Sequence, residues 1–241
     1  MRDPALWRPT RAIPGKEKDS FVLDLSSIWA GSHYIAKLQH ACYVPLIQAH
    51  IRGHVLDCGC GRAPYYGIYG RNTTQSTCID RSADPLVAPL LDAVVDLNGP
   101  LPFPDGHFDS VLLTDVIAHV RDPKALMSEL ARVLRPNGKL VLTTPFIYWL
   151  CEYPHDYYHP SRFALEDLCR TSGLAVERLE AYGGQADVLM DTLNKMMSSG
   201  VRYHLFSLLS RLLQRTGWLA RDRDRTKETY SLGYIVVAAK G

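Results

Sequence analysis

Short apolar runs that each end in an aspartate constrain the fold of this chain more than any other feature of its sequence. The aspartates are Asp57, Asp80, Asp96 and Asp115. Turn residues and segments with helical spacing separate the runs, as in the apolar positions of residues 123–134. Strands that alternate with helices predict a doubly wound α/β fold with a mostly parallel sheet. The carboxyl ends of its strands, and therefore these carboxylates, are expected along one edge of that sheet.

The first apolar run leads into a glycine turn. Val55–Leu56–Asp57 is followed by Gly59 and Gly61, and Pro64 comes next. The glycines let the backbone turn where a side chain would obstruct it, and Pro64 suits the first position of a helix whose free N–H groups can face a ligand. The pattern is typical of a strand, a nucleotide-binding turn and a helix. Similar turns also join strands to helices for steric reasons alone.

The second run, Thr77–Cys78–Ile79, ends in Asp80, about twenty residues after the first glycine, as in nucleotide-binding βαβ units. The end of this strand should lie beside the glycine turn, where a carboxylate can accept hydrogen bonds from both hydroxyls of a ribose. The alternative is that Asp80 caps a turn leading to Asp84–Pro85.

The length of 241 residues fits one large domain with additions. Residues 1–50 are expected to form an N-terminal arm and two or three helices that cover the site, and residues 51–241 a Rossmann-like domain. A helical insertion at about 185–220 should precede the last strand. Its leucines and methionines fit a core or homodimer contact, or a lid over an apolar acceptor. Arg202, Arg211 and Arg215 of the same segment could meet an acidic group or a lipid surface.

The composition limits the classes of partner and the cellular compartment that we expect. The 27 basic and 25 acidic residues are mostly interspersed and give a net charge of +2, so no nucleic-acid partner is expected. No apolar run approaches the roughly 18 residues of a membrane span, and the polar N-terminus does not resemble a leader, so we expect no integral membrane segment. The six cysteines are scattered without Cys-x-x-Cys spacing, which favours a reducing, cytoplasmic compartment.

Three segments together resemble a known family. They are the first motif, Val-Leu-Asp-Cys-Gly-Cys-Gly at 55–61, the run Leu-Pro-Phe-Pro-Asp-Gly-His-Phe-Asp at 101–109, and Glu-Leu-Ala-Arg-Val-Leu-Arg-Pro-Asn-Gly-Lys-Leu-Val-Leu at 129–142. They are similar to class I S-adenosylmethionine-dependent methyltransferases, in the branch of ubiquinone-type and other small-molecule enzymes. The resemblance covers about residues 50–180. It implies a seven-stranded sheet whose last strand is antiparallel, S-adenosylmethionine as cofactor and a small-molecule acceptor.

The resemblance also implies roles for individual residues. Gly59 and Gly61 would let the backbone approach the methionine part of the cofactor, and Asp57 would hold its ammonium directly or through water. The remaining cofactor-binding candidates are Asp80 at the ribose, Asp96 at the adenine amino group, Leu97 against the adenine ring, and Asp115 and Val116 where the fourth strand opens onto the cofactor.

Catalytic candidates follow the fifth predicted strand. If the acceptor is a hydroxyl, a positioned histidine or carboxylate would help to remove its proton, and His155 and Asp156 lie in the densest polar cluster of that segment. The family often has a His-Asp-Tyr sequence near here. The cluster fits equally well a loop that anchors the next helix. His119 could reach the rim of the site or pack against a helix.

A metal site is not expected in this cluster. His155 and His159 have metal-ligand spacing only on a helix, and Pro154 and Pro160 argue against a helix there.

Three functions remain open. The first is methyl transfer to a small-molecule acceptor through an oxygen nucleophile of a sugar, lipid-linked or secondary-metabolite type. The second is a cofactor-binding subunit without catalysis, with a regulatory or assembly role. The third is a nicotinamide oxidoreductase, which is disfavoured because Pro64 stands where the dinucleotide pattern has its third glycine.

Overall fold

A computed structural model describes residues 1–17, 19–81 and 84–241. Its main sheet has seven strands in the order β5-β4-β3-β6-β7-β9-β8. The strands are β3 (Gly53–Cys58), β4 (Thr73–Asp80), β5 (Ala93–Val94), β6 (Phe108–Thr114), β7 (Leu134–Pro145), β8 (Leu174–Tyr182) and β9 (Gly233–Lys240). Strand β9 runs antiparallel to both of its neighbours and the other pairs are parallel. The predicted fold class, including the antiparallel last strand, is confirmed.

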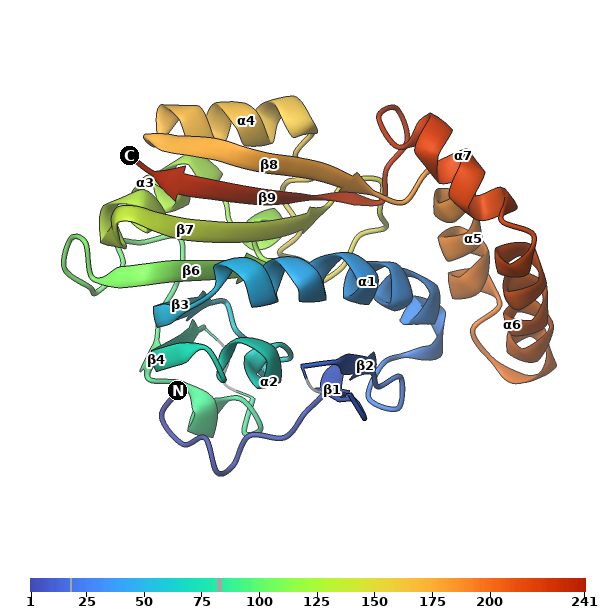
Figure 1. Cartoon of the computed structure of the whole chain (residues 1–241), viewed down its shortest axis with the longest axis horizontal. Coiled ribbons are helices and arrows are strands. Elements are labelled where there is room, and N and C mark those ends of the chain that lie inside the picture. Colours follow the sequence, from blue (N-terminus) through green and yellow to red (C-terminus); the bar gives the residue numbers. More distant parts are fainter. Residues whose placement is uncertain (18, 82–83) are drawn as a thin grey trace.

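Helices cover both faces of the sheet (Figure 1). They are α1 (His33–His50), α2 (Tyr66–Tyr69), α3 (Pro123–Val133), α4 (Arg162–Thr171), α5 (Gln185–Met196), α6 (Gly200–Arg215) and α7 (Trp218–Thr226), with short 3-10 turns η1 (Ala30–Ser32), η2 (Ala88–Leu90) and η3 (Ile117–His119). Two further strands, β1 (Ala12–Pro14) and β2 (Phe21–Leu23), form a separate antiparallel pair.

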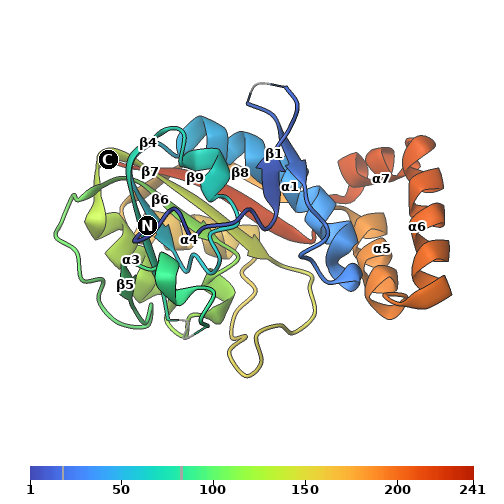
Figure 2. The ribbon, with the colours of Figure 1, turned by 90° about the horizontal axis from the view of Figure 1, so that it is seen from below.

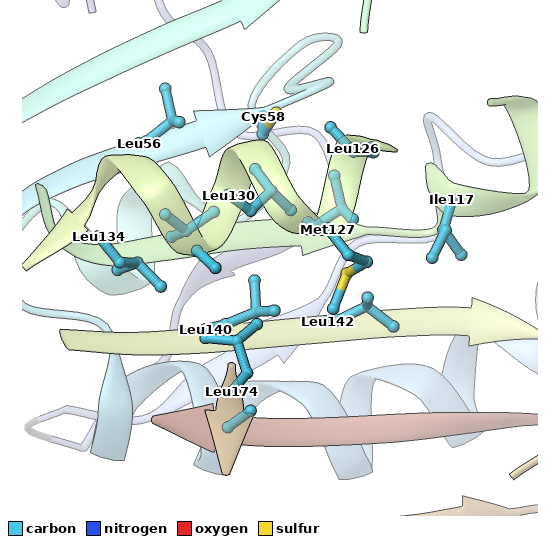
Figure 3. Packing of buried hydrophobic residues seen from close by; sticks show 14 of the residues in the cluster. Leu56, Cys58, Ile117, Leu126, Met127, Leu130, Leu134, Leu140, Leu142 and Leu174 are labelled. Atoms are coloured by element: carbon cyan, nitrogen blue, oxygen red, sulfur yellow. The ribbon is translucent and has the colours of Figure 1, made fainter. Parts of the chain in front are cut away.

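The period of two along each strand divides the core into two layers. On β7, Leu140 and Leu142 join the cluster that contains α3 and α4 residues, whereas Val141 between them joins the cluster under α1 and α2. Figure 3 shows the first layer, where Leu130 of α3 lies over the sheet. Strands buried on both faces explain the continuous apolar runs in the sequence.

The region before β3 differs from the prediction of two or three helices. A single helix, α1, spans residues 33–50 and includes Pro45. Its side chains Tyr43, Val44, Leu46 and Ile47 are all buried. Burial of this face stabilises the helix despite the backbone hydrogen bond that proline removes.

Helix α3 ends before Asn137–Gly138, a residue pair that is typical of the end of a helix. It ends at Val133, and the chain is extended from Leu134 onward. Arg135 precedes Pro136, and the residue before a proline disfavours the helical conformation. Asn137, with a φ of 63°, therefore turns within the extended segment rather than at the end of the helix.

The helical insertion between β8 and β9 extends further than the expected 185–220. Helix α7 continues to Thr226 and includes the charged run Arg-Asp-Arg-Asp-Arg at 221–225. Helices α5, α6 and α7 lie beyond one end of the sheet, with α6 outermost in both views (Figures 1 and 2).

Candidate functional site

A cavity of about 990 Å³ lies at the carboxyl ends of strands β3, β4, β5 and β6. Most of the predicted cofactor residues line it: Gly59, Gly61, Asp80, Asp96, Leu97, Asp115 and Val116. They come from four different strand ends and meet because the strands are parallel. The structure thus brings the predicted cluster to one place.

The turn after β3 requires its glycines. Gly59 has a φ of +69°, and a Cβ atom there would lie 2.6 Å from Cγ2 of Val116. The N–H groups of Gly59 and Cys60 donate to the carbonyl oxygen of Ile79, at 2.8 and 3.1 Å. Gly61 has a φ of +52° and open space where a Cβ would stand. The turn is therefore fixed to the end of β4 and leaves room above Gly61 for a ligand.

Asp80 connects that turn to the cavity. Its Oδ2 accepts a hydrogen bond of 2.9 Å from the backbone N–H of Gly61. Asp80 is half-buried and lines the cavity. The carboxylate therefore lies beside the glycine turn, where the spacing in the sequence places it.

Asp96 and Leu97 form another part of the cavity wall. Asp96 Oδ1 accepts hydrogen bonds from the backbone and side-chain nitrogens of Asn98, at 3.0 and 2.8 Å, and these bonds lower the pKa of the carboxyl. Leu97 is buried in the core cluster under α3 and α4. An exposed carboxylate beside an apolar side chain suits a flat ring with an amino group at its edge.

Asp115 belongs to a buried polar network on the floor of the cavity. It accepts hydrogen bonds from the hydroxyl groups of Tyr43, at 2.9 Å, and Thr143, at 3.1 Å, and from the Gln39 amide, at 3.2 Å. Burial raises the pKa of Asp115, and the nearby Arg11 guanidinium opposes that rise. These bonds hold the carboxylate in a fixed orientation.

Asp57 lies apart from the cavity. It is buried, and Tyr69 of α2 donates a hydrogen bond of 2.6 Å to its Oδ2. Burial raises its pKa to about 7, although the Tyr69 bond acts in the opposite direction. Among the predicted cofactor residues, Asp57 is the one that is absent from the described cavity lining.

The two catalytic candidates point into their own loop. Asp156 accepts a hydrogen bond of 2.8 Å from the backbone of Cys151 and lies 3.0 Å from Nε2 of His159. Nδ1 of His155 lies 2.8 Å from the hydroxyl of Tyr157. Neither His155 nor Asp156 is among the described residues that line the cavity. Their contacts correspond to the anchoring role that the sequence left open.

His119 of η3 does line the cavity. Its Nδ1 lies 2.9 Å from the backbone oxygen of His155. A carbonyl oxygen only accepts, so Nδ1 must carry the proton and donate, and in the neutral ring Nε2 carries the lone pair. The loop after β7 thus fixes the tautomer of a cavity histidine.

The sequence predicts that residues 1–50 cover the site, but it does not single out the residues that line this cavity. Arg11, Trp29 and Tyr65 line it, as does Glu152 from the loop after β7. Tyr65 belonged to a predicted helix, but Arg11 and Trp29 lie in segments without regular periodicity. Their position depends on long-range contacts, which a local pattern does not reveal.

A second cavity, of about 480 Å³, lies between α5 and the segment after β7. Trp149 lines it and stacks on Trp29 of the first cavity, with ring centroids 5.4 Å apart and an interplanar angle of 6°. Lys195 lies 4.3 Å from the ring centroid of Tyr148 and pairs with Asp191. The stacked tryptophans therefore lie between two cavities.

Among the described residues, no group of three or more histidine, cysteine, aspartate or glutamate side chains is arranged to hold a metal ion. No helix in the described part of the chain has the length and apolar character needed to cross a membrane.

The fold and the cavity together define a doubly wound α/β domain with a large cavity at the carboxyl edge of its sheet, which is where such folds bind ligands. Residues 56–142 match the family model described as a methyltransferase domain. The matched segment runs from β3 into β7 and contains all four aspartates of the described cavity lining. This match confirms, for residues 56–142, the predicted resemblance to methyltransferases.

Individual relatives match over parts of their length. An uncharacterized methyltransferase of Schizosaccharomyces pombe is 41% identical over 59 residues, which are 24% of this chain and 21% of that protein. A ubiquinone biosynthesis O-methyltransferase of Xanthomonas euvesicatoria pv. vesicatoria is 34% identical over 103 residues, covering 37% of this chain and 42% of that protein. The chain thus spans less than half of the length of these relatives.

A solved structure, the cyclase SpnF, shares the fold. It has a TM-score of 0.56 and 22% identity, with 86% of this chain and 82% of that chain covered. Since the name of this neighbour is that of a cyclase, the likeness supports the fold and leaves the reaction to be argued from the site.

Proposed function

We propose that this chain transfers a methyl group from S-adenosylmethionine to an oxygen nucleophile of a small-molecule acceptor. The observation that carries the proposal is the convergence of the glycine turn and the strand-end residues on one cavity, within a segment that matches a methyltransferase domain. A volume of about 990 Å³ at the top of the range for small-molecule sites accommodates a cofactor together with an acceptor.

The lining chemistry fits the cofactor. Asp80 would bind the ribose hydroxyls, and Leu97 and Val116 would pack against the adenine, with Asp96 at its amino group. The methionine part would lie over Gly61, where the structure has open space.

Arg11, a cation near Asp115 on the same cavity, would face the carboxylate of the methionine part. The buried and hydrogen-bonded Asp57 would act on the shape of the turn rather than on the ligand.

Bound S-adenosylmethionine supplies an electrophilic methyl group on a sulfonium. The protein contributes by holding an acceptor oxygen in line with that methyl, which is an effect of position and orientation. We assign the proton of the acceptor hydroxyl to Nε2 of His119, because the Nδ1 contact with the His155 carbonyl fixes the tautomer that general-base catalysis needs. His155 and Asp156 would then position the loop that holds His119.

The acceptor would enter between the N-terminal segment and the loop after β7. Trp29 and Trp149 stack there, and the smaller cavity behind Trp149 has a mainly apolar and aromatic lining with Lys195 at its edge. An acceptor with an apolar or aromatic part beside its hydroxyl fits this arrangement. The relative described as a ubiquinone biosynthesis O-methyltransferase supports an oxygen acceptor of this general kind.

Residues 1–50 and the helical insertion would form the cover of the acceptor site in this proposal, and a homodimer through the insertion stays a prediction. The free state of all six cysteines supports action in a reducing, cytoplasmic compartment.

The test combines binding and turnover. Calorimetry with S-adenosylmethionine, its demethylated product and a nicotinamide dinucleotide should give heat only with the two adenosyl ligands. Incubation with a labelled methyl donor and fractionated cell extract should then label a small molecule. Binding without labelling of any fraction would favour the non-catalytic subunit, and binding of the dinucleotide alone would favour an oxidoreductase.

A further inference from the structure

Helix α6 has an apolar side that no other element of the described chain covers. Its inner side packs onto the insertion, with Phe206 buried and Leu213 packed beside it. Five other apolar residues point to solvent and are 47% to 73% exposed. They are Val201, Leu205, Leu208, Leu209 and Leu212. Their spacing places them on one side of the helix, away from the buried side that carries Phe206, and we call them the α6 stripe.

Basic side chains border the α6 stripe on both sides. At 100° per residue, Arg202 lies on one flank, and Arg211 and Arg215 lie on the other, and all three are exposed. The sequence has no acidic residue between Asp191 and Asp222. The outer side of α6 is therefore apolar in the middle, and the charged residues of the helix are all basic.

We propose that α6 docks on the surface of an anionic lipid bilayer, with its axis in the plane of the interface. A helix with an apolar stripe flanked by basic residues buries the stripe among the acyl chains near the headgroups, while the arginine stems extend to the lipid phosphates. Trp218, which is exposed at the start of α7, is a residue type that favours the same interface.

The charge pattern favours a bilayer over a second copy of this chain. A two-fold contact through the α6 stripe would bring the arginines of both copies together with no carboxylate from the same segment to pair with them. An anionic surface provides the opposite charge instead. The position of α6 also suits a flat surface, because it is the outermost helix of the insertion in both views (Figures 1 and 2).

Contacts connect this helix to the larger cavity. The hydroxyl oxygen of Tyr203 in α6 lies 2.7 Å from Nδ1 of His33. Nε2 of His33 lies 3.0 Å from the carbonyl oxygen of Ile28, and Ile28 lines the cavity. A bilayer bound to α6 would thus lie close to the segment that borders the cavity. The docking itself does not depend on methyl transfer, so the two proposals can fail separately.

The experiment is sedimentation of the full chain with vesicles of phosphatidylcholine alone or with about one-third phosphatidylglycerol, at low and high salt. Binding is expected only to the anionic vesicles and should weaken with salt. Leu205→Gln/Leu208→Gln should lower the partition about tenfold or more through lost apolar burial. Arg211→Gln/Arg215→Gln should lower it about 25-fold, since each basic residue near such a surface contributes about fivefold.

Matched controls separate these effects from general damage. Phe163→Gln removes an exposed apolar side chain from α4, and Lys124→Gln/Arg170→Gln removes two exposed charges elsewhere. Both controls should keep wild-type partition, and thermal unfolding should show that every variant is folded.

Three outcomes would overturn the proposal. They are no sedimentation of wild type with anionic vesicles, equal loss of binding in the controls, or a dimer in solution that dissociates in Leu205→Gln/Leu208→Gln while vesicle binding is absent. The last result would assign the α6 stripe to a second copy.

Discussion

Asp80 offers the most direct test of the cofactor site. Replacement by alanine is expected to weaken S-adenosylmethionine binding while the fold stays intact. The carboxylate lies on the cavity at the end of β4, and Gly61 donates to one of its oxygens at 2.9 Å. In the proposed complex the same carboxylate accepts from the ribose.

The magnitude follows from the bonds that are lost. A hydrogen bond to a charged group contributes about 1.5 to 3 kcal/mol, which corresponds to about a tenfold to hundredfold loss of affinity. Asp80→Asn keeps an oxygen that can accept from Gly61 and loses the charge. Its affinity should therefore lie between those of wild type and Asp80→Ala.

Isothermal titration calorimetry of the three proteins measures the effect, and thermal unfolding without ligand checks the turn. Asp105→Ala, at an exposed site outside the described cavity lining, is the control and should bind as wild type does. If Asp80→Ala binds S-adenosylmethionine with wild-type affinity, or if Asp80→Asn is the weaker of the two, the ribose assignment is refuted.

The other predictions concern the pH dependence of stability, catalysis and the insertion. The pKa of Asp57 is raised from 3.8 to about 7, which corresponds to about 4 kcal/mol. The unfolding free energy should therefore fall by up to that amount as the pH rises from about 4 to about 7. Urea titrations should show a flatter pH dependence for Asp57→Asn. His119→Ala should lower kcat about a hundredfold or more with unchanged cofactor affinity, whereas His155→Ala, which keeps its backbone oxygen, should retain most of the activity in the same assay. Asp187 is fully buried and bonded by Arg223, so Asp187→Ala should lower the unfolding free energy by about 3–5 kcal/mol, and a loss below about 1 kcal/mol in urea titrations would contradict that role.

The sequence predicts the sheet and its ligand edge because both depend on local patterns. Strands buried on two faces have continuous apolar runs in the sequence, and the turn at Gly59 and Gly61 has residues that tolerate a positive φ. Parallel strands then bring their ends together regardless of their distance in the chain, so Asp80 and Asp115 reach one cavity.

Features that depend on contacts between distant segments were not predicted. The continuation of α1 through Pro45 reflects burial against the sheet and α2. The arrival of Arg11 at the cavity depends on the path of the N-terminal arm. The side chain of Asp57 points toward Tyr69 and not into the cavity. The sequence motif would be the same for either orientation, so it does not predict which one occurs.

The roles of the catalytic candidates His155 and Asp156 also could not be predicted from the sequence alone. A dense polar sequence after a strand fits an active-site loop and a self-anchored loop equally well, because both need groups that form hydrogen bonds. The hydrogen-bond partners differ: Asp156 bonds within its loop, while His119 donates to the loop carbonyl of His155 and lines the cavity. In the proposed mechanism the loop acts through the backbone oxygen of His155, which a motif of side chains does not record. The pair His119→Ala and His155→Ala tests this, because His155→Ala keeps that oxygen.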